Sequence, residues 1–90
     1  AVASNLTKSL ALQLAKYKIR VNAVAPGFTY PTGLTKDYKK ERLVEMAENS
    51  LLKRLCSPED VANGIYFLLS NLSSFVNGHT LDINGGFWMN

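Results

Sequence analysis

Residues 20–25, RVNAVA, form a short and largely apolar run that ends at Pro26-Gly27. A run of this length is typical of a strand that is buried on both faces of a parallel sheet. The segment before it carries apolar residues at a spacing of four, namely Leu6, Leu10 and Leu14. This spacing predicts an amphipathic helix over residues 1–16. A helix that leads almost directly into a buried strand favours an α/β fold.

Further elements are predicted downstream. A shorter, more polar helix is expected near residues 37–49. The start of another helix is marked by a cap, a proline and two acids, in the order Ser57, Pro58, Glu59 and Asp60. Residues 80–84 predict a strand, and a helical crossover makes it parallel to residues 20–25. Because open α/β sheets bind ligands at the carboxyl ends of their strands, the loop after Pro26-Gly27 is the predicted place for chemistry.

The composition fits one small domain of 90 residues with a net charge of +3. Basic residues around 36–42 alternate with acids, which indicates a solvated helix face and not a nucleic-acid-binding surface. A single cysteine, Cys56, forms no internal disulfide and favours a reducing compartment. We therefore expect a cytoplasmic protein with no membrane span, no nucleic-acid partner and no metal site.

The residues alone assign no catalytic group. No phosphate-binding glycine cluster follows a strand. The lone histidine, His79, lies beside a turn, where an exposed histidine is more common than a catalyst. Tyr17-Lys18 are adjacent and point apart in a helix, so they form no acid–base pair. On this basis the chain is an α/β segment with one functional loop.

Four collinear blocks resemble the short-chain dehydrogenase/reductase family. They are NLTKSLALQLA at residues 5–15, IRVNAVAPG at 19–27, PEDVA at 58–62 with FLLS at 67–70, and NGHTLDINGG at 77–86. The resemblance covers nearly the whole chain and matches the C-terminal portion of the family. It implies the last two strands, with flanking helices, of a Rossmann-type doubly wound parallel sheet in a single domain.

The family's chemistry implies hydride transfer between NAD or NADP and a small-molecule carbonyl or alcohol. Its Tyr-x-x-x-Lys pair would fall before Ala1, so the 90-residue chain alone is expected to be inactive. The resemblance implies cofactor contacts at Pro26, Gly27, Phe28, Thr29 and Thr32. It also implies a substrate lid over residues 30–49, with Phe28, Tyr30 and Leu34 toward the substrate. Family members are commonly homodimers or homotetramers.

Two alternatives to a true fragment of an enzyme stay open. One is a catalytically dead module, derived from the same fold, that binds copies of itself or another subunit through its helix faces. The other is a complete enzyme of which this chain is only a part. Gly27 is further expected to leave room for the backbone to approach a flat nicotinamide ring, because glycine has no side chain.

Overall fold

The computed structural model describes residues 2–86. In chain order, its elements are α1 (Val2–Leu14), the 3-10 turn η1 (Ala15–Tyr17), β1 (Ala23–Pro26), α2 (Lys40–Glu48), α3 (Pro58–Leu69), η2 (Asn71–Ser73) and β2 (Thr80–Ile83). The predicted elements are all present, with ends that differ from the expected ones by a few residues. The fold class is the predicted one: α/β, with two parallel strands and flanking helices as in a Rossmann-type sheet.

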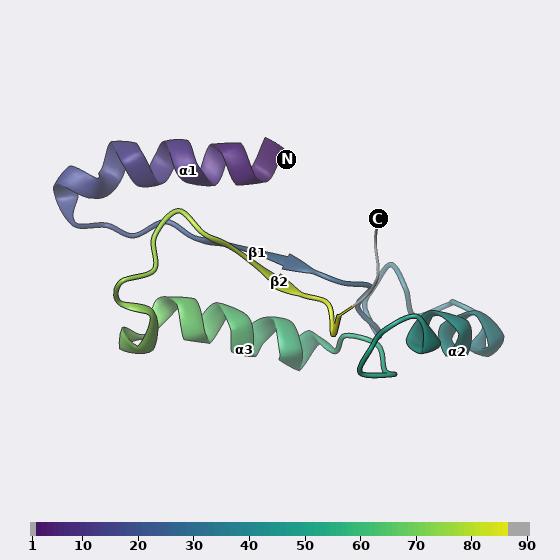
Figure 1. Cartoon of the computed structure of the whole chain (residues 1–90). Coiled ribbons are helices and arrows are strands. Elements are labelled where there is room, and N and C mark those ends of the chain that lie inside the picture. The colour runs from purple at the N-terminus through teal and green to yellow at the C-terminus, as the bar shows by residue number, and fades with distance from the viewer. Residues whose placement is uncertain (1, 87–90) are drawn as a thin grey trace.

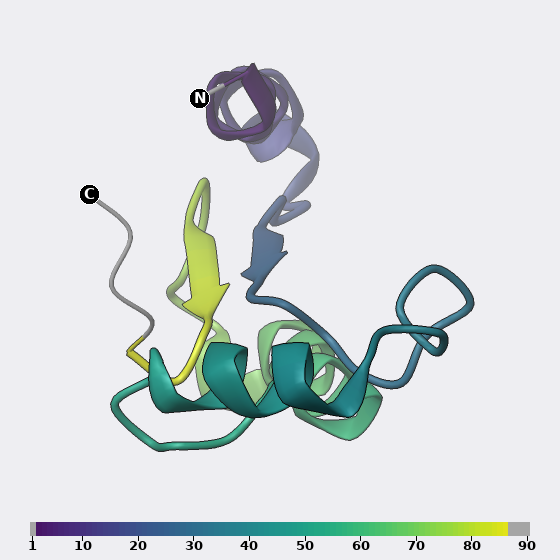
Figure 2. The ribbon, with the colours of Figure 1, turned by 90° about the vertical axis from the view of Figure 1, so that its right-hand side faces the viewer.

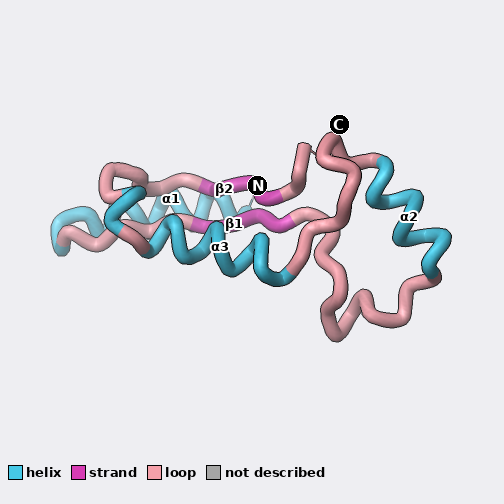
Figure 3. The backbone as a smooth tube through the Cα atoms, turned by 90° about the horizontal axis from the view of Figure 1, so that it is seen from below, coloured by secondary structure: helices cyan, strands magenta, loops and turns pink. Residues whose placement is uncertain are grey.

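β1 and β2 pair in parallel, with Ala23 opposite Thr80 and Pro26 opposite Ile83. This confirms the parallel pairing that the crossover rule predicts. α1 lies over one face of the pair and α3 over the other (Figures 1 and 2). α2 stands beyond the carboxyl ends of both strands, at the end of a long loop (Figure 3). The segment of residues 30–49 therefore begins and ends at the carboxyl edge of the sheet, where ligand binding is predicted.

β1 begins later than predicted, at Ala23 instead of residue 20. Two asparagine side chains replace the regular ladder there. The N–H of Val21 donates to the Asn77 side-chain oxygen (2.9 Å), and the Asn22 side-chain amide donates to the carbonyl of Val76 (3.0 Å). The carbonyl of Val21 accepts the N–H of Gly78 (2.8 Å), so both backbone groups of Val21 are satisfied before the regular strand pairing begins.

Arg20 joins this segment to the C-terminal end of α3. Its guanidinium donates to the carbonyls of Leu68 and Val76, both at 3.0 Å, and makes longer bonds to the carbonyl of Ser70 and the hydroxyl of Ser73. The last carbonyls of a helix have no partner within the helix, and the helix dipole places negative charge there. Arg20 supplies both the donors and the positive charge.

α3 approaches β2 closely at Gly64. A Cβ placed on Gly64 would overlap the Cδ1 atom of Ile83 and lie 3.3 Å from its Cγ1. Glycine in a helix interior is unfavourable by about 1 kcal/mol relative to alanine. The close approach gives the physical reason for glycine here, because the space of a methyl group is already filled by Ile83.

Little of the apolar surface is covered by the described residues themselves. Among them, only Ala11 and Leu68 are buried hydrophobic residues, at 6% and 7% exposure. Large apolar side chains stay exposed on α1 and α3, including Leu6, Leu12, Tyr66 and Leu69. The radius of gyration is 15.3 Å, against about 12 Å for a compact domain of this length. The chain is thus more extended than a self-contained domain.

Candidate functional site

A cavity of about 460 Å³ opens at the carboxyl ends of the two strands. It is lined by Ala25, Pro26, Gly27, Phe28, Met46, Asp82 and Asn84. The loop after β1 supplies one wall, β2 supplies another, and α2 contributes Met46 from beyond the strand ends. A cavity at this edge of a parallel sheet is where α/β folds bind ligands. The structure therefore brings three of the predicted cofactor residues, Pro26, Gly27 and Phe28, to one cavity.

Gly27 continues the strand pairing for one step past β1. Its N–H donates to the carbonyl of Ile83 at 2.8 Å. A Cβ on Gly27 would lie 3.1 Å from both Cα and Cβ of Asn84. A side chain on Gly27 would thus crowd the end of β2, which is a structural reason for glycine here. The expected room for a nicotinamide ring stays a prediction.

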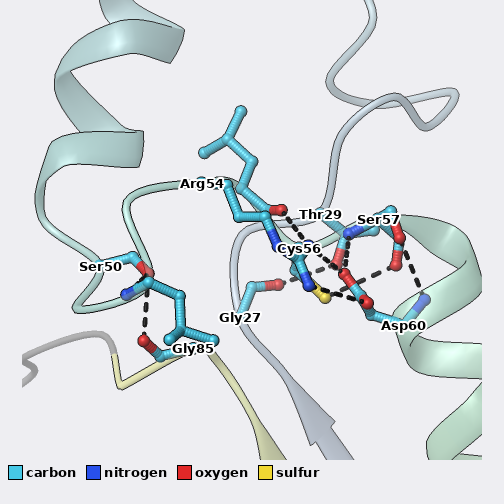
Figure 4. Close-up of polar contacts among 10 residues, drawn as sticks. Gly27, Thr29, Ser50, Arg54, Cys56, Ser57, Asp60 and Gly85 are labelled. Atoms are coloured by element: carbon cyan, nitrogen blue, oxygen red, sulfur yellow. Dashed lines mark hydrogen bonds and ion pairs between the residues drawn. The ribbon is translucent and has the colours of Figure 1, made fainter.

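The next three residues run beside Cys56, the residue two before α3. The N–H of Cys56 donates to the carbonyl of Phe28 (3.2 Å), and the N–H of Tyr30 donates to the carbonyl of Cys56 (2.9 Å). Thr29 and Cys56 thus form a one-residue parallel bridge. Figure 4 shows the two segments side by side, with the N-terminal end of α3 next to them.

This bridge leaves Thr29 with a free backbone donor. In a parallel bridge the N–H and carbonyl of the central residue point away from the partner strand. The carbonyl of Thr29 accepts the Thr35 hydroxyl (2.8 Å), and the Thr29 hydroxyl donates to the carbonyl of Gly27 (2.9 Å). Within residues 2–86 the N–H of Thr29 has no acceptor. Such an amide, one residue past the cavity wall at Phe28, suits an external carbonyl such as that of a carboxamide.

The hydroxyl of Thr32 is already hydrogen-bonded within a local turn. Since the Thr35 hydroxyl donates to Thr29, the hydroxyl–hydroxyl bond of 2.9 Å must use the proton of Thr32. The Thr32 oxygen also accepts the N–H of Thr35 (3.2 Å) and that of Leu34 (3.3 Å). Its single proton and its acceptor sites are all used, so a cofactor contact from this hydroxyl requires the turn to open. The cofactor role of Thr32 stays a prediction.

The predicted substrate residues are spread along the loop. Phe28 lines the cavity and packs against Tyr38, with ring centroids 5.0 Å apart at 58°. Leu34 is 93% exposed, and neither Leu34 nor Tyr30 is among the residues that line this cavity. The substrate roles of Tyr30 and Leu34, and the lid function of residues 30–49, stay predictions.

Segment 50–57 connects α2 to α3 and is held at both ends. Ser50, which is 4% exposed, donates its hydroxyl to the carbonyl of Gly85 (3.1 Å). At the other end, Ser57 and Asp60 form a capping box: Asp60 N–H donates to the Ser57 hydroxyl (3.1 Å), and Ser57 N–H donates to the Asp60 carboxylate (2.8 Å). The predicted helix start at Ser57 is confirmed.

The Asp60 carboxylate is also the partner of Arg54. The guanidinium donates two N–H groups to it, at 2.7 and 3.2 Å. The hydrogen bond from Arg54 is the largest cause that holds the pKa of Asp60 well below its usual range, and the Ser57 donors add to it. The same bond raises the pKa of Arg54. Both groups are therefore charged at every pH near neutrality.

Sequence reasoning missed several groups that the structure brings to the site. Met46 and Asp82 line the cavity, Cys56 pairs with Thr29 through its backbone, and Arg54 and Asp60 form an ion pair beside it. Asp82 had one available signal, since it lies on β2 one residue before the last residue of the strand, Ile83, at the carboxyl edge. Cys56 had none, because it acts through backbone atoms that every residue carries.

Comparisons with known proteins decide the family. Residues 1–88 match the family model described as "Enoyl-(Acyl carrier protein) reductase". The 3-oxoacyl-[acyl-carrier-protein] reductase FabG of Aquifex aeolicus is 44% identical over 82 residues, which are 91% of this chain and 33% of the relative. The chain belongs to the short-chain dehydrogenase/reductase family. This confirms the resemblance seen in the sequence.

Solved structures of the family superimpose closely. A 3-oxoacyl-[acyl-carrier protein] reductase from Brucella melitensis matches with a TM-score of 0.89 and 38% identity, over 99% of this chain and 33% of that one. A 4-hydroxyisoleucine dehydrogenase complexed with NADH matches with a TM-score of 0.86 and 32% identity, over 96% of this chain and 36% of that one. The chain thus spans about a third of the length of the relatives that it matches.

The described residues contain neither a membrane-spanning helix nor a cluster of metal-ligating side chains. No helix within residues 2–86 is both long and apolar enough to cross a membrane. The same residues hold no group of three or more metal-ligating side chains of the His, Cys, Asp or Glu type.

Proposed function

We propose that this chain is part of an NAD(P)(H)-dependent oxidoreductase that interconverts a carbonyl and an alcohol on a small molecule. The observation that carries the proposal is the N–H of Thr29, which has no acceptor among residues 2–86 and follows a cavity of about 460 Å³ at the carboxyl edge of the parallel pair. Membership of the family and the NADH complex of a relative support it. The bound nicotinamide would supply or accept the hydride.

In this proposal the chain's own residues bind and orient. Pro26, Gly27, Phe28 and Thr29 form the wall against the nicotinamide, and the Thr29 amide donates to its carboxamide oxygen. Residues 30–49 close over the substrate, with Phe28, Tyr30 and Leu34 toward it. The catalytic tyrosine and lysine of the family lie outside these 90 residues, so the isolated chain is proposed to be inactive. The full-length protein is proposed to be a cytoplasmic homodimer or homotetramer.

Hydrogen exchange of the full-length chain tests the cofactor assignment. ADP-ribose shares the adenosine and pyrophosphate of NADH but lacks the nicotinamide. We expect NADH or NADPH, but not ADP-ribose, to slow exchange of the Thr29 amide. The amide of Leu52, which already donates to the carbonyl of Gly85 (3.1 Å), is the control and should not respond. Equal protection by ADP-ribose, or none by either dinucleotide, contradicts the assignment.

A second candidate function is an interaction module without catalysis. The exposed apolar residues on α1, α3 and η2, such as Leu12, Tyr66, Leu69 and Leu72, favour it, because such surfaces mark interfaces. Sedimentation of the full-length chain at several concentrations, with an NADH titration and a carbonyl-reduction assay alongside, separates the two functions. Self-association without dinucleotide binding by the full-length chain supports the module. Dinucleotide binding and carbonyl reduction by the full-length chain support the enzyme.

A further inference from the structure

The loop that holds the Thr29 amide is tied to the rest of the fold at few points. At its start, the N–H of Gly27 donates to the carbonyl of Ile83. The contacts of Thr29 with Gly27 and Thr35 are internal to the loop and move with it. Beyond Gly27, the hydrogen bonds that join residues 28–30 to another element within the described chain are the two to Cys56. The orientation of the Thr29 amide therefore depends on where the backbone of Cys56 lies.

Cys56 in turn lies between two residues that are fixed to α3. Ser57 is the N-cap of α3. Arg54, on the other side of Cys56 in the sequence, donates two guanidinium N–H groups to the Asp60 carboxylate (Figure 4). Arg54 also donates to the carbonyl of Leu55 at 3.2 Å. A bidentate arginine–carboxylate contact fixes direction as well as distance. The ion pair thus closes residues 54–60 into a loop that sets the path of the Cys56 backbone.

We infer that Arg54 and Asp60 are positioning residues for the nicotinamide-binding segment: their ion pair holds the Cys56 backbone, and Cys56 orients the Thr29 amide. This inference rests on the proposed function. Neither side chain is among those that line the cavity of about 460 Å³ beside Gly27 and Phe28, although both line a neighbouring cavity with Asp82 and Asn84. Their route to the Thr29 amide is the backbone of Cys56.

The exposure of the pair separates this role from a merely structural one. The side chains are 58% and 27% exposed, and exposed ion pairs contribute little to stability. A change at Arg54 should therefore shift cofactor binding while the thermal midpoint moves little. A merely structural role predicts the opposite: a lower midpoint and unchanged affinity in the folded fraction.

The test uses three variants of the full-length chain: Arg54→Met, Arg54→Lys and, as a matched control, Lys8→Met on the exposed side of α1. Two quantities are measured, the exchange rate of the Tyr30 amide without cofactor and the Kd for NADH or NADPH, and the thermal midpoint is recorded beside them. For Arg54→Met we expect both to rise about two- to fivefold, the range of coupling measured for exposed pairs. Arg54→Lys should recover part of the loss, and Lys8→Met should change neither quantity.

Several results overturn the inference. An unchanged Tyr30 exchange rate in Arg54→Met shows that the ion pair does not hold the loop. Faster exchange with an unchanged Kd shows that the loop's position does not matter for the cofactor. If Arg54→Met fails to fold, Asp60→Asn replaces it, because an asparagine oxygen still accepts from Ser57. Absence of dinucleotide binding by the unmodified protein refutes the proposed function itself, and the Tyr30 exchange rate then still decides whether Arg54 orders the loop.

Discussion

Replacing Gly64 by alanine should destabilise the protein although alanine is the better helix former. In an exposed helix the change would stabilise by about 1 kcal/mol. Here the new methyl group would overlap Cδ1 of Ile83 and lie 3.3 Å from Cγ1. Overpacking of this kind costs about 1–3 kcal/mol. The overlap therefore outweighs the helix preference, and we expect a net loss of about 1 kcal/mol.

Ile83→Val removes the overlapping atom and makes the reasoning testable. Alone, it leaves a small cavity and costs about 0.5–1.5 kcal/mol. Combined with Gly64→Ala, the new methyl group fills that cavity, so the double variant should be at least as stable as Ile83→Val. The two changes should thus be coupled by about 1–2 kcal/mol.

Urea unfolding of the full-length chain measures all three variants. Ala62→Gly, at an exposed position of the same helix, gives the glycine–alanine difference without the contact to β2. Two results together would refute the reasoning. The first is a gain in unfolding free energy for Gly64→Ala as large as the loss for Ala62→Gly, and the second is an effect that simply adds to that of Ile83→Val. The close approach of α3 to β2 would then not be the reason for glycine at position 64.

Three further predictions follow from local geometry. Gly27→Ala should lower the free energy of unfolding by about 1–3 kcal/mol, and with it the thermal midpoint, because its Cβ would lie 3.1 Å from Asn84; an unchanged midpoint with weaker NADH binding would instead show that glycine leaves room for the nicotinamide ring. Lys53 has a φ of 59°, so Lys53→Gly should stabilise by about 0.5–1 kcal/mol in urea unfolding, since glycine adopts this conformation without strain; a lower midpoint contradicts it. The Arg54 contact lowers the folded-state pKa of Asp60, so its charge stabilises the fold above the unfolded-state pKa of about 3.9 and this contribution is lost as the pH falls further. Asp60→Asn should therefore be less stable than the unmodified protein at pH 7, and the gap should narrow below about pH 4; a constant gap refutes the assignment.

The sequence predicted those features that have local or topological causes. The α3 start was readable because capping uses particular side chains, Ser57 and Asp60, at a fixed spacing. The parallel pairing followed from the handedness of helical crossovers, which does not depend on residue identity. The position of a cavity beside the loop after Pro26 followed from the same topology.

Other features leave no pattern in the sequence. The bridge between Thr29 and Cys56 uses backbone atoms of residues far apart in the chain, so no residue type marks it. The late start of β1 depends on contacts between distant segments, from Asn77 to Val21 and from Asn22 to Val76. The close contact of Gly27 with Asn84 was not foreseen, because this neighbour is known only once the strands are in register. The family resemblance named the loop residues, whereas their hydrogen-bond partners required the structure.

The arginine at the end of α3 has a consequence for the order of folding. Arg20 is 48 residues from Leu68 and 56 from Val76 along the chain. Its bonds can form only after the intervening chain has closed, and the entropy lost in closing such a loop must be offset by contacts that form at the same time. α3 can thus form early from its local capping signals, whereas the Arg20 bonds to its last turn wait for the closure of the chain. Loss of the Arg20 bonds should accordingly speed unfolding and leave the folding rate almost unchanged, as for contacts made after the transition state.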